Sequence, residues 1–168
     1  MAVTTQFARI MPGQLSECRR SVAELDRLCS FEMVPASEHL DLDWAGNALV
    51  RVCEHAGVGN VPALRRAIDG DDEVNAAYRD YPYSVMEQPR ALEPADVLTL
   101  ATALCDIDMD RVLSALPSNP RKLKDAIRGV LTDFHGDPRP YITRHFNALR
   151  DFYTVAADKH LAIVVWWD

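Results

Sequence analysis

The chain has 168 residues, of which 48% are hydrophobic and 26% are charged, and its formal net charge is −7. This length and composition are typical of one globular domain, which can bury a sizeable core without a disulfide or a structural metal. The acidic excess repels phosphates and anionic lipid surfaces, so it argues against nucleic acid and membranes as partners.

The cysteines and the N-terminus indicate where the protein resides. Four scattered cysteines, with no CxxC pair, each occupy an apolar position of a helical pattern, where a thiol behaves as a small hydrophobic group (Cys18, Cys29, Cys53 and Cys105). The N-terminus lacks the charged and apolar regions of a signal peptide, and no apolar run approaches the ~18 residues of a membrane-spanning helix. We therefore expect a reduced, soluble, cytoplasmic protein.

The N-terminal part of the chain predicts a strand followed by helix. Residues 3–10 alternate loosely and are rich in residues that favour strands, and Pro12 is well placed at the first position of a helix. Apolar residues then recur at spacings of three and four over residues 15–29. This stretch is one helix or, because Ser21 and Glu24 form a capping box, two short helices in succession.

The middle of the chain contains one clear helix. It begins after Asp43, which we predict as its N-cap, and it ends at Gly57, while residues 40–42 form a short extended lead-in. Beyond Gly57 the periodicity weakens as far as residue 93, and only a short helix over residues 61–68 is predicted. Irregular segments of this length often carry function.

Further helices and a strand follow. Pro94 opens a helix whose inward positions include Leu98 and Cys105. The next apolar patterns, separated by proline-rich breaks, predict helices over residues 109–116, 121–134 and 141–159. An apolar strand completes the chain.

This final strand determines the predicted architecture. Ile163, Val165 and Trp167 alternate with Val164 and Trp166, so both faces of the strand are apolar and both need to be covered. The simplest arrangement pairs it with the N-terminal strand in a small central sheet, against which about five to seven helices pack. We therefore predict an α+β (mixed α/β) fold formed by one domain over residues 1–168.

Four short motifs span the whole chain. They are Arg9-Ile10-x-Pro12-x-x-Leu15, Leu40-Asp41-Leu42-Asp43-x-Ala45, Leu92-x-Pro94-x-x-Val97, and Leu149-x-x-Phe152-Tyr153-x-x-Ala156-Ala157 before the final strand. In this order they resemble the YfbM-like family of bacterial proteins, whose role is not known. The chain departs from the family at Gly46, where the family usually has tryptophan, and at Glu93, where threonine often precedes the proline. The resemblance implies a mixed α/β single domain and supplies no catalytic residues.

The strongest candidate for chemistry is the segment Glu38-His39-x-Asp41-x-Asp43. Its carboxylates suit Mg or Mn, and its imidazole admits Zn or Fe. In an extended segment His39, Asp41 and Asp43 point to one face, as a hydrolytic metal site requires, and Arg9 can orient an anionic group there. We favour a simpler interpretation, in which Asp43 caps a helix and Asp41 bonds turn amides or Arg9. We therefore expect neither a bound metal nor a cofactor.

Other catalytic patterns are missing from the sequence. Cys53 and His55 are two residues apart on a predicted helix and face different ways. The sequence contains no Gly-x-Ser-x-Gly elbow and no glycine-rich phosphate loop. The sequence therefore leans against an enzyme and leaves the question open.

Aromatic residues are the remaining candidates for binding. Trp44, Tyr81 and Tyr83 are of the kinds that anchor protein interfaces. With the net charge of −7, they favour a non-enzymatic module for a basic protein partner, of which a toxin-neutralising immunity protein is one example. One alternative is homodimerisation through an apolar face. The other is a small-molecule or metal-dependent hydrolase or binder with a cleft near His39, Asp41 and Asp43.

Overall fold

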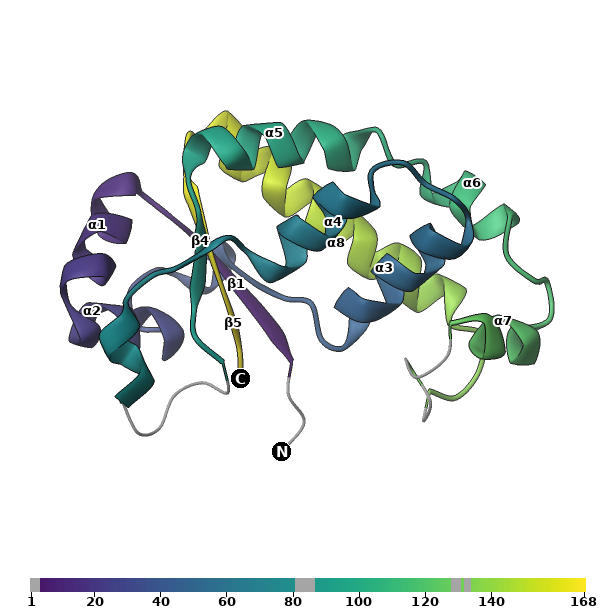
Figure 1. The fold of residues 1–168 in the computed structure, drawn as a ribbon, viewed down its shortest axis with the longest axis horizontal. Coiled ribbons are helices and arrows are strands. Elements are labelled where there is room, and N and C mark those ends of the chain that lie inside the picture. The colour runs from purple at the N-terminus through teal and green to yellow at the C-terminus, as the bar shows by residue number, and fades with distance from the viewer. Residues whose placement is uncertain (1–3, 81–86, 128–130, 132–133) are drawn as a thin grey trace.

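The computed structural model describes residues 4–80, 87–127, 131 and 134–168, and in this part it shows a five-stranded sheet (Figure 1). The strands lie in the order β2-β1-β5-β4-β3, and every neighbouring pair is antiparallel. The strands are β1 (Thr5–Ile10), β2 (His39–Asp41), β3 (Asp72–Glu73), β4 (Arg90–Leu92) and β5 (Ala162–Trp167).

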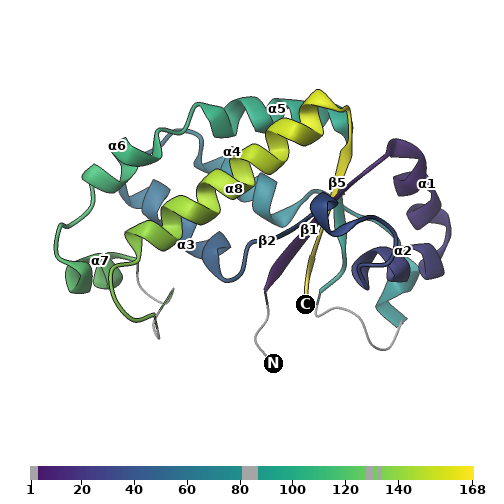
Figure 2. The ribbon, with the colours of Figure 1, turned by 180° about the vertical axis from the view of Figure 1, so that it is seen from behind.

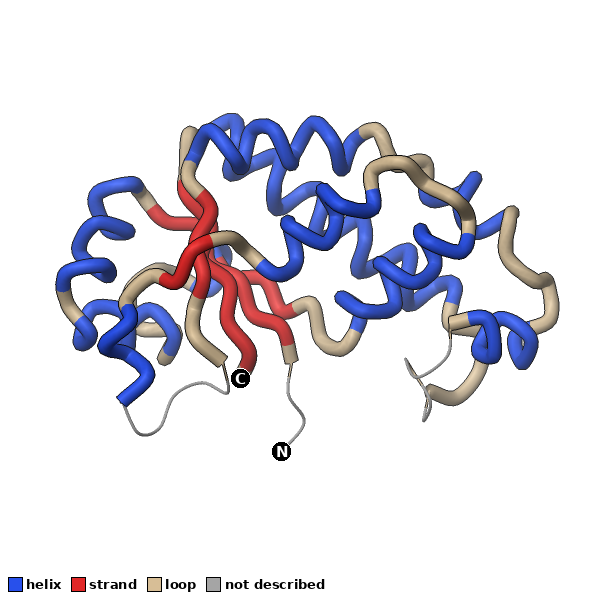
Figure 3. The backbone as a smooth tube through the Cα atoms, viewed as in Figure 1, coloured by secondary structure: helices blue, strands red, loops and turns tan. Residues whose placement is uncertain are grey.

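The described residues contain eight α-helices on the two sides of this sheet. Helices α1 and α2 lie on one side, and α3 to α8 form a larger layer on the other (Figures 1 and 3). The helices are α1 (Pro12–Arg20), α2 (Val22–Cys29), α3 (Ala45–His55), α4 (Val61–Asp69), α5 (Pro94–Cys105), α6 (Met109–Ser114), α7 (Pro120–Ala126) and α8 (Arg139–Asp158). The α+β prediction is confirmed, with slightly more helices than expected.

Strand β5 is the centre of the sheet, between β1 and β4. Ile163 and Val165 face the larger core with the helices α3 to α8, whereas Val164 and Trp166 face the smaller core with α1 and α2. Both sets are fully buried. The prediction of a central strand covered on both faces, paired with the N-terminal strand, is therefore confirmed.

The chain forms two short helices where the sequence left one or two open. Ser21 has an extended conformation, with φ of −134°, and its side chain accepts a hydrogen bond from the Glu24 amide at 3.3 Å. This is the N-terminal half of the predicted capping box, and it starts α2 immediately after α1. The bend lets both helices cover the same face of β5.

The predictions for two helices, α7 and α5, need correction. Helix α7 ends at Ala126, not at residue 134, and Leu131 has a left-handed φ of 56° that an α-helix does not contain. Residues 128–130 and 132–133 lie outside the described part of the chain. In α5, Leu98 is 55% exposed and Cys105 is also exposed, because the buried stripe of that helix is Val97, Leu100, Ala101 and Leu104.

Helix α8 spans the length of the larger layer and packs against α5, α3 and α6 (Figure 2). Its 20 residues bury the predicted apolar stripe together with one polar residue, His145. In the part of the chain that the structure describes, neither α8 nor any other helix combines the length and the apolar character that crossing a membrane requires.

Candidate functional site at the start of α3

The acidic segment singled out in the sequence lies at an edge of the sheet. Strand β2 pairs with β1, with Asp41 opposite Gln6 and His39 opposite Ala8. His39 and Asp41 therefore share one face of the strand, and Leu40 packs against the larger core on the other. The chain then turns through residues 42–44 into α3 (Figure 2).

The turn is fixed by its own carboxylate and by the sheet. The Asp41 Oδ1 atom accepts a hydrogen bond from the Asp43 amide at 2.7 Å, as the simpler interpretation of Asp41 predicts. Leu42 between them is fully buried, and its amide donates to the Thr5 carbonyl at 2.9 Å. Asp43 has a left-handed φ of 52°, a conformation that aspartate tolerates better than most residues because its short side chain bonds locally.

The predicted N-cap role of Asp43 is wrong. Trp44 occupies the N-cap position of α3 and makes no side-chain capping bond. Asp43 is left-handed where an N-cap residue is usually extended, and its Oδ2 accepts a hydrogen bond from the Tyr141 hydroxyl at 3.1 Å. Trp44, which follows Asp43 in the chain, is 55% exposed.

The first turns of α8 complete the site. The rings of Tyr141 and His145 lie 4.4 Å apart between centroids, and Arg144 Nη2 lies 3.1 Å from His145 Nε2. A guanidinium can only donate, so the neutral imidazole accepts at Nε2 and carries its proton on Nδ1. We call this surface the acidic junction; it consists of Asp41, Asp43, Trp44, Tyr141, Arg144 and His145.

Burial and charge keep both ring groups of the junction neutral. Burial raises the pKa of Tyr141 to about 12, and the charge and hydrogen bond of Asp43 add to this rise. Burial lowers the pKa of His145, and the adjacent Arg144 guanidinium lowers it further, against the opposing charges of Asp43 and Asp41. Near pH 7 the tyrosine therefore remains a hydroxyl donor and the histidine an acceptor.

The lowered pKa of His145 predicts a pH-dependent stability. The unfolded chain takes up a proton at this imidazole near the ordinary pKa of 6.5, whereas the folded chain does so only at lower pH. The free energy of unfolding should therefore fall as pH drops below about 6.5. The His145→Gln variant, which keeps an acceptor for Arg144, should show a shallower slope in urea titrations from pH 7 to pH 5. Equal slopes for the variant and the wild type would contradict this assignment.

Arg9 is occupied elsewhere. Its Nε atom pairs with Glu38 at 2.6 Å, its Nη2 donates to the Ser37 carbonyl at 2.9 Å, and its guanidinium lies 4.7 Å from the ring centroid of Phe152. These contacts join β1, α8 and the segment before β2. Arg9 thus links these three segments and does not contact the acidic junction.

His39 is also separate from the two aspartates in its contacts. Its ring lies 5.0 Å from that of Phe31 and 6.1 Å from that of Trp166. Burial lowers the pKa of His39, partly opposed by the backbone of Val34 and Phe7 and by the charge of Glu38. Within the described ranges, no three histidine, cysteine, aspartate or glutamate side chains form a group that could hold a metal ion. His39 thus packs among aromatic rings, while Asp41 holds the turn before α3 and Asp43 contacts Tyr141.

Two further candidates from the sequence cannot be placed in the site, and three residues of the site were not among the candidates. Tyr81 and Tyr83 lie outside the described residues. Tyr141, Arg144 and His145 were not singled out, although Tyr141 and His145 have the i,i+4 spacing of neighbours on a helix, and a histidine on an apolar stripe was readable as a signal. The contact between Tyr141 and Asp43 could not be predicted from the sequence, because it joins residues 98 positions apart.

Comparison with known proteins identifies the fold and leaves the function open. No protein-family model matches the chain, and no curated protein matches it significantly. The crystal structure of YfbM from Escherichia coli, a protein of unknown function, is similar, with a TM-score of 0.63 and 13% sequence identity. The match covers 98% of this chain and 99% of that one. The chain therefore has a YfbM-like fold, in agreement with the resemblance of the four sequence motifs.

Proposed function

We propose that this chain is a non-enzymatic module that binds a basic protein partner at the acidic junction. The observation that carries the proposal is the position of Trp44, which is 55% exposed at the start of α3 and follows Asp41 and Asp43 in the same turn. Tryptophan is among the residues that most often dominate binding energy at interfaces. Carboxylates and an exposed indole in one turn suit a partner with arginine or lysine side chains, which can stack on the ring and pair with the acids.

The junction is ordered before any partner arrives. Asp41 holds the Asp43 amide, and Tyr141 from α8 holds the Asp43 carboxylate. Little conformational freedom is left to lose on binding, and such preorganisation raises affinity. Asp41 is exposed, and its second carboxylate oxygen has no hydrogen-bond partner among the described residues, so it can still accept from a partner.

The charge of the whole chain supports the same kind of partner. A net charge of −7 attracts a basic protein over several ångströms and raises the rate of encounter. A toxin-neutralising protein of the immunity type, which occludes a basic surface of its target, is one class of module that works in this way.

The proposal is tested by affinity capture from native lysate at low salt, with the wild-type chain, Trp44→Ala and Leu98→Ala as baits. Leu98 is the matched control, because it is also 55% exposed but lies on α5. We expect the wild type and Leu98→Ala to recover one basic protein in stoichiometric amount, and Trp44→Ala to lose it. Recovery of no protein, or of a second copy of this chain as the sole product, would contradict the proposal, and the second copy would indicate a homodimer.

A further inference from the structure

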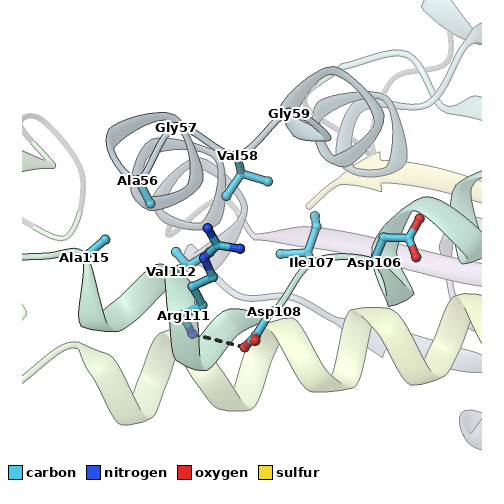
Figure 4. A pocket seen from close by; sticks show the side chains of 10 residues that line it. All are labelled: Ala56, Gly57, Val58, Gly59, Asp106, Ile107, Asp108, Arg111, Val112 and Ala115. Atoms are coloured by element: carbon cyan, nitrogen blue, oxygen red, sulfur yellow. Dashed lines mark hydrogen bonds between the residues drawn. The ribbon is translucent and has the colours of Figure 1, made fainter.

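A pocket lies at the opposite end of α3 from the acidic junction. It has a volume of about 390 Å³ and lies between the α3–α4 connection, residues 56–59, and the start of α6 (Figure 4). The 11 residues of α3 separate the two sites by about 16 Å along the helix axis. The volume is at the lower end of the range typical of small-molecule sites.

A guanidinium enters this pocket. Figure 4 shows the Arg111 side chain extending from α6 toward Val58 on the opposite wall. Its backbone amide is held by Asp108 Oδ1 at 3.0 Å, which fixes the start of the side chain. Among the described residues the Arg111 guanidinium has neither an ion pair within 4.0 Å nor a hydrogen bond. A planar guanidinium with free donors is suited to a carboxylate or a phosphate.

The other charges of the pocket distinguish between these two anions. Asp106 and Asp108 line the same pocket, so its formal charge is −1 with Arg111 included. A phosphate dianion would be repelled by these two carboxylates, whereas a ligand with one carboxylate and one ammonium group would be attracted by all three side chains. Val58, Ile107 and Val112 are aliphatic residues that line the pocket, next to which a short apolar side chain can lie.

The walls of the pocket are held in place from within the fold. Asn60 Nδ2 donates to the Ala103 carbonyl at 3.1 Å, which joins the α3–α4 connection to α5. The Val58 amide donates to the Cys53 carbonyl at 3.0 Å. Gly59 is not in the left-handed region, and a Cβ atom there would meet nothing within 4 Å. Its backbone does not require glycine, so a larger side chain at this position can narrow the pocket without backbone strain.

We propose that this pocket binds a small zwitterion of the amino-acid type, with its carboxylate on Arg111 and its ammonium group attracted by the charges of Asp106 and Asp108, which are exposed at the rim of the pocket. The site is distinct from the acidic junction and does not depend on the partner proposed there. A free amino acid bound between the α3–α4 connection and the start of α6 would give the module a small-molecule ligand in addition to its protein partner.

The test is a titration of the whole chain with each of the twenty standard amino acids, followed by calorimetry and by NMR shifts of the pocket amides. For the best-binding amino acid, two comparators lack one charge each: the corresponding amine without the carboxylate, and the corresponding acid without the amine. We expect one amino acid or a few related ones to bind, and both comparators to bind at least about tenfold more weakly, because each comparator loses one charged contact.

Two variants separate binding in the pocket from binding elsewhere. Arg111→Gln should raise the Kd of the bound amino acid at least about tenfold. Gly59→Leu should abolish binding by occupation of the pocket, while Gly13→Leu, at a helix position that is equally open, should leave it unchanged. Far-UV circular dichroism checks that each variant is folded. Absence of binding by all twenty amino acids, equal binding to Arg111→Gln, or tighter binding of inorganic phosphate would each overturn the proposal.

Discussion

Replacement of Trp166 by alanine is expected to lower the free energy of unfolding by about 3–5 kcal/mol, the usual range for a large aromatic residue removed from a core. Trp166 is fully buried in the central strand and is the largest of the fully buried side chains in the described part of the chain. Its ring contacts Phe31 at 5.6 Å and His39 at 6.1 Å between centroids. The layer of α1 and α2 cannot close the resulting cavity without movement of the central sheet, so little of the loss should be recovered.

The matched control for this prediction is Trp167→Ala. Trp167 follows directly in β5, points to the opposite face, and is only partly buried against the larger core. Its replacement should cost less than half as much. Urea denaturation followed by far-UV circular dichroism measures both variants without relying on the tryptophan fluorescence that they alter. In thermal unfolding followed by the same signal, the two variants should differ by several degrees in Tm, since 1 kcal/mol corresponds to roughly 2–4 °C for a domain of this size. Equal losses would show that the two faces of β5 are not packed as described.

The contrast between Trp166 and Trp167 illustrates which parts of the fold could be predicted from the sequence. The alternation in β5 identified a strand that is apolar on both faces, and only a central position satisfies such a strand. Strands β3 and β4 were not predicted, because they have two and three residues, include Asp72, Glu73 and Arg90, and exist only through pairing with distant residues. Their short length leaves no local periodicity to detect.

The helix errors have a related cause. Apolar residues continue at helical spacing beyond Ala126, and Ile127 and Leu131 are indeed buried. The pattern therefore identified core residues correctly and their backbone conformation wrongly, since a turn can deliver the same side chains to the core. In α5 almost every position is apolar, so composition alone could not exclude Leu98 and Cys105 from the buried stripe.

Only the part of the candidate site that is contiguous in the sequence could be predicted. Asp41, Asp43 and Trp44 are adjacent in the sequence and were identified as a cluster, whereas the contribution of α8 depends on tertiary packing. The role assigned to Asp43 was wrong because capping preferences describe an extended residue, and the Asp41 side chain and the Thr5 backbone hold this turn in a left-handed conformation instead. Local rules failed at the position where the fold brings two distant segments together.

Replacement of Trp44 by alanine is expected to weaken the binding of the captured basic partner. The loss should be at least about 2 kcal/mol in binding free energy, or roughly thirtyfold in Kd, which is the size of effect that defines an interface hot spot. The stability of the chain should change by less than about 0.5 kcal/mol, because the indole is mostly exposed and makes no capping bond. Surface plasmon resonance with the purified partner measures Kd, and urea denaturation measures stability. Leu98→Ala should leave both unchanged.

The charge of Asp41 should affect the association rate of the partner, whereas the Trp44 indole should affect its dissociation rate. Asp41→Asn keeps an oxygen that can accept from the Asp43 amide, so the turn is preserved while one negative charge is removed. The association rate should fall and its dependence on salt should weaken, with little change in dissociation, because rim charges mainly steer encounter. Trp44→Ala should instead accelerate dissociation, because the indole contributes contacts made only in the complex. If Trp44→Ala bound as tightly as the wild type while Asp41→Asn did not, the partner would recognise the charge of the acidic junction and not the Trp44 indole, and the role proposed for Trp44 would be wrong.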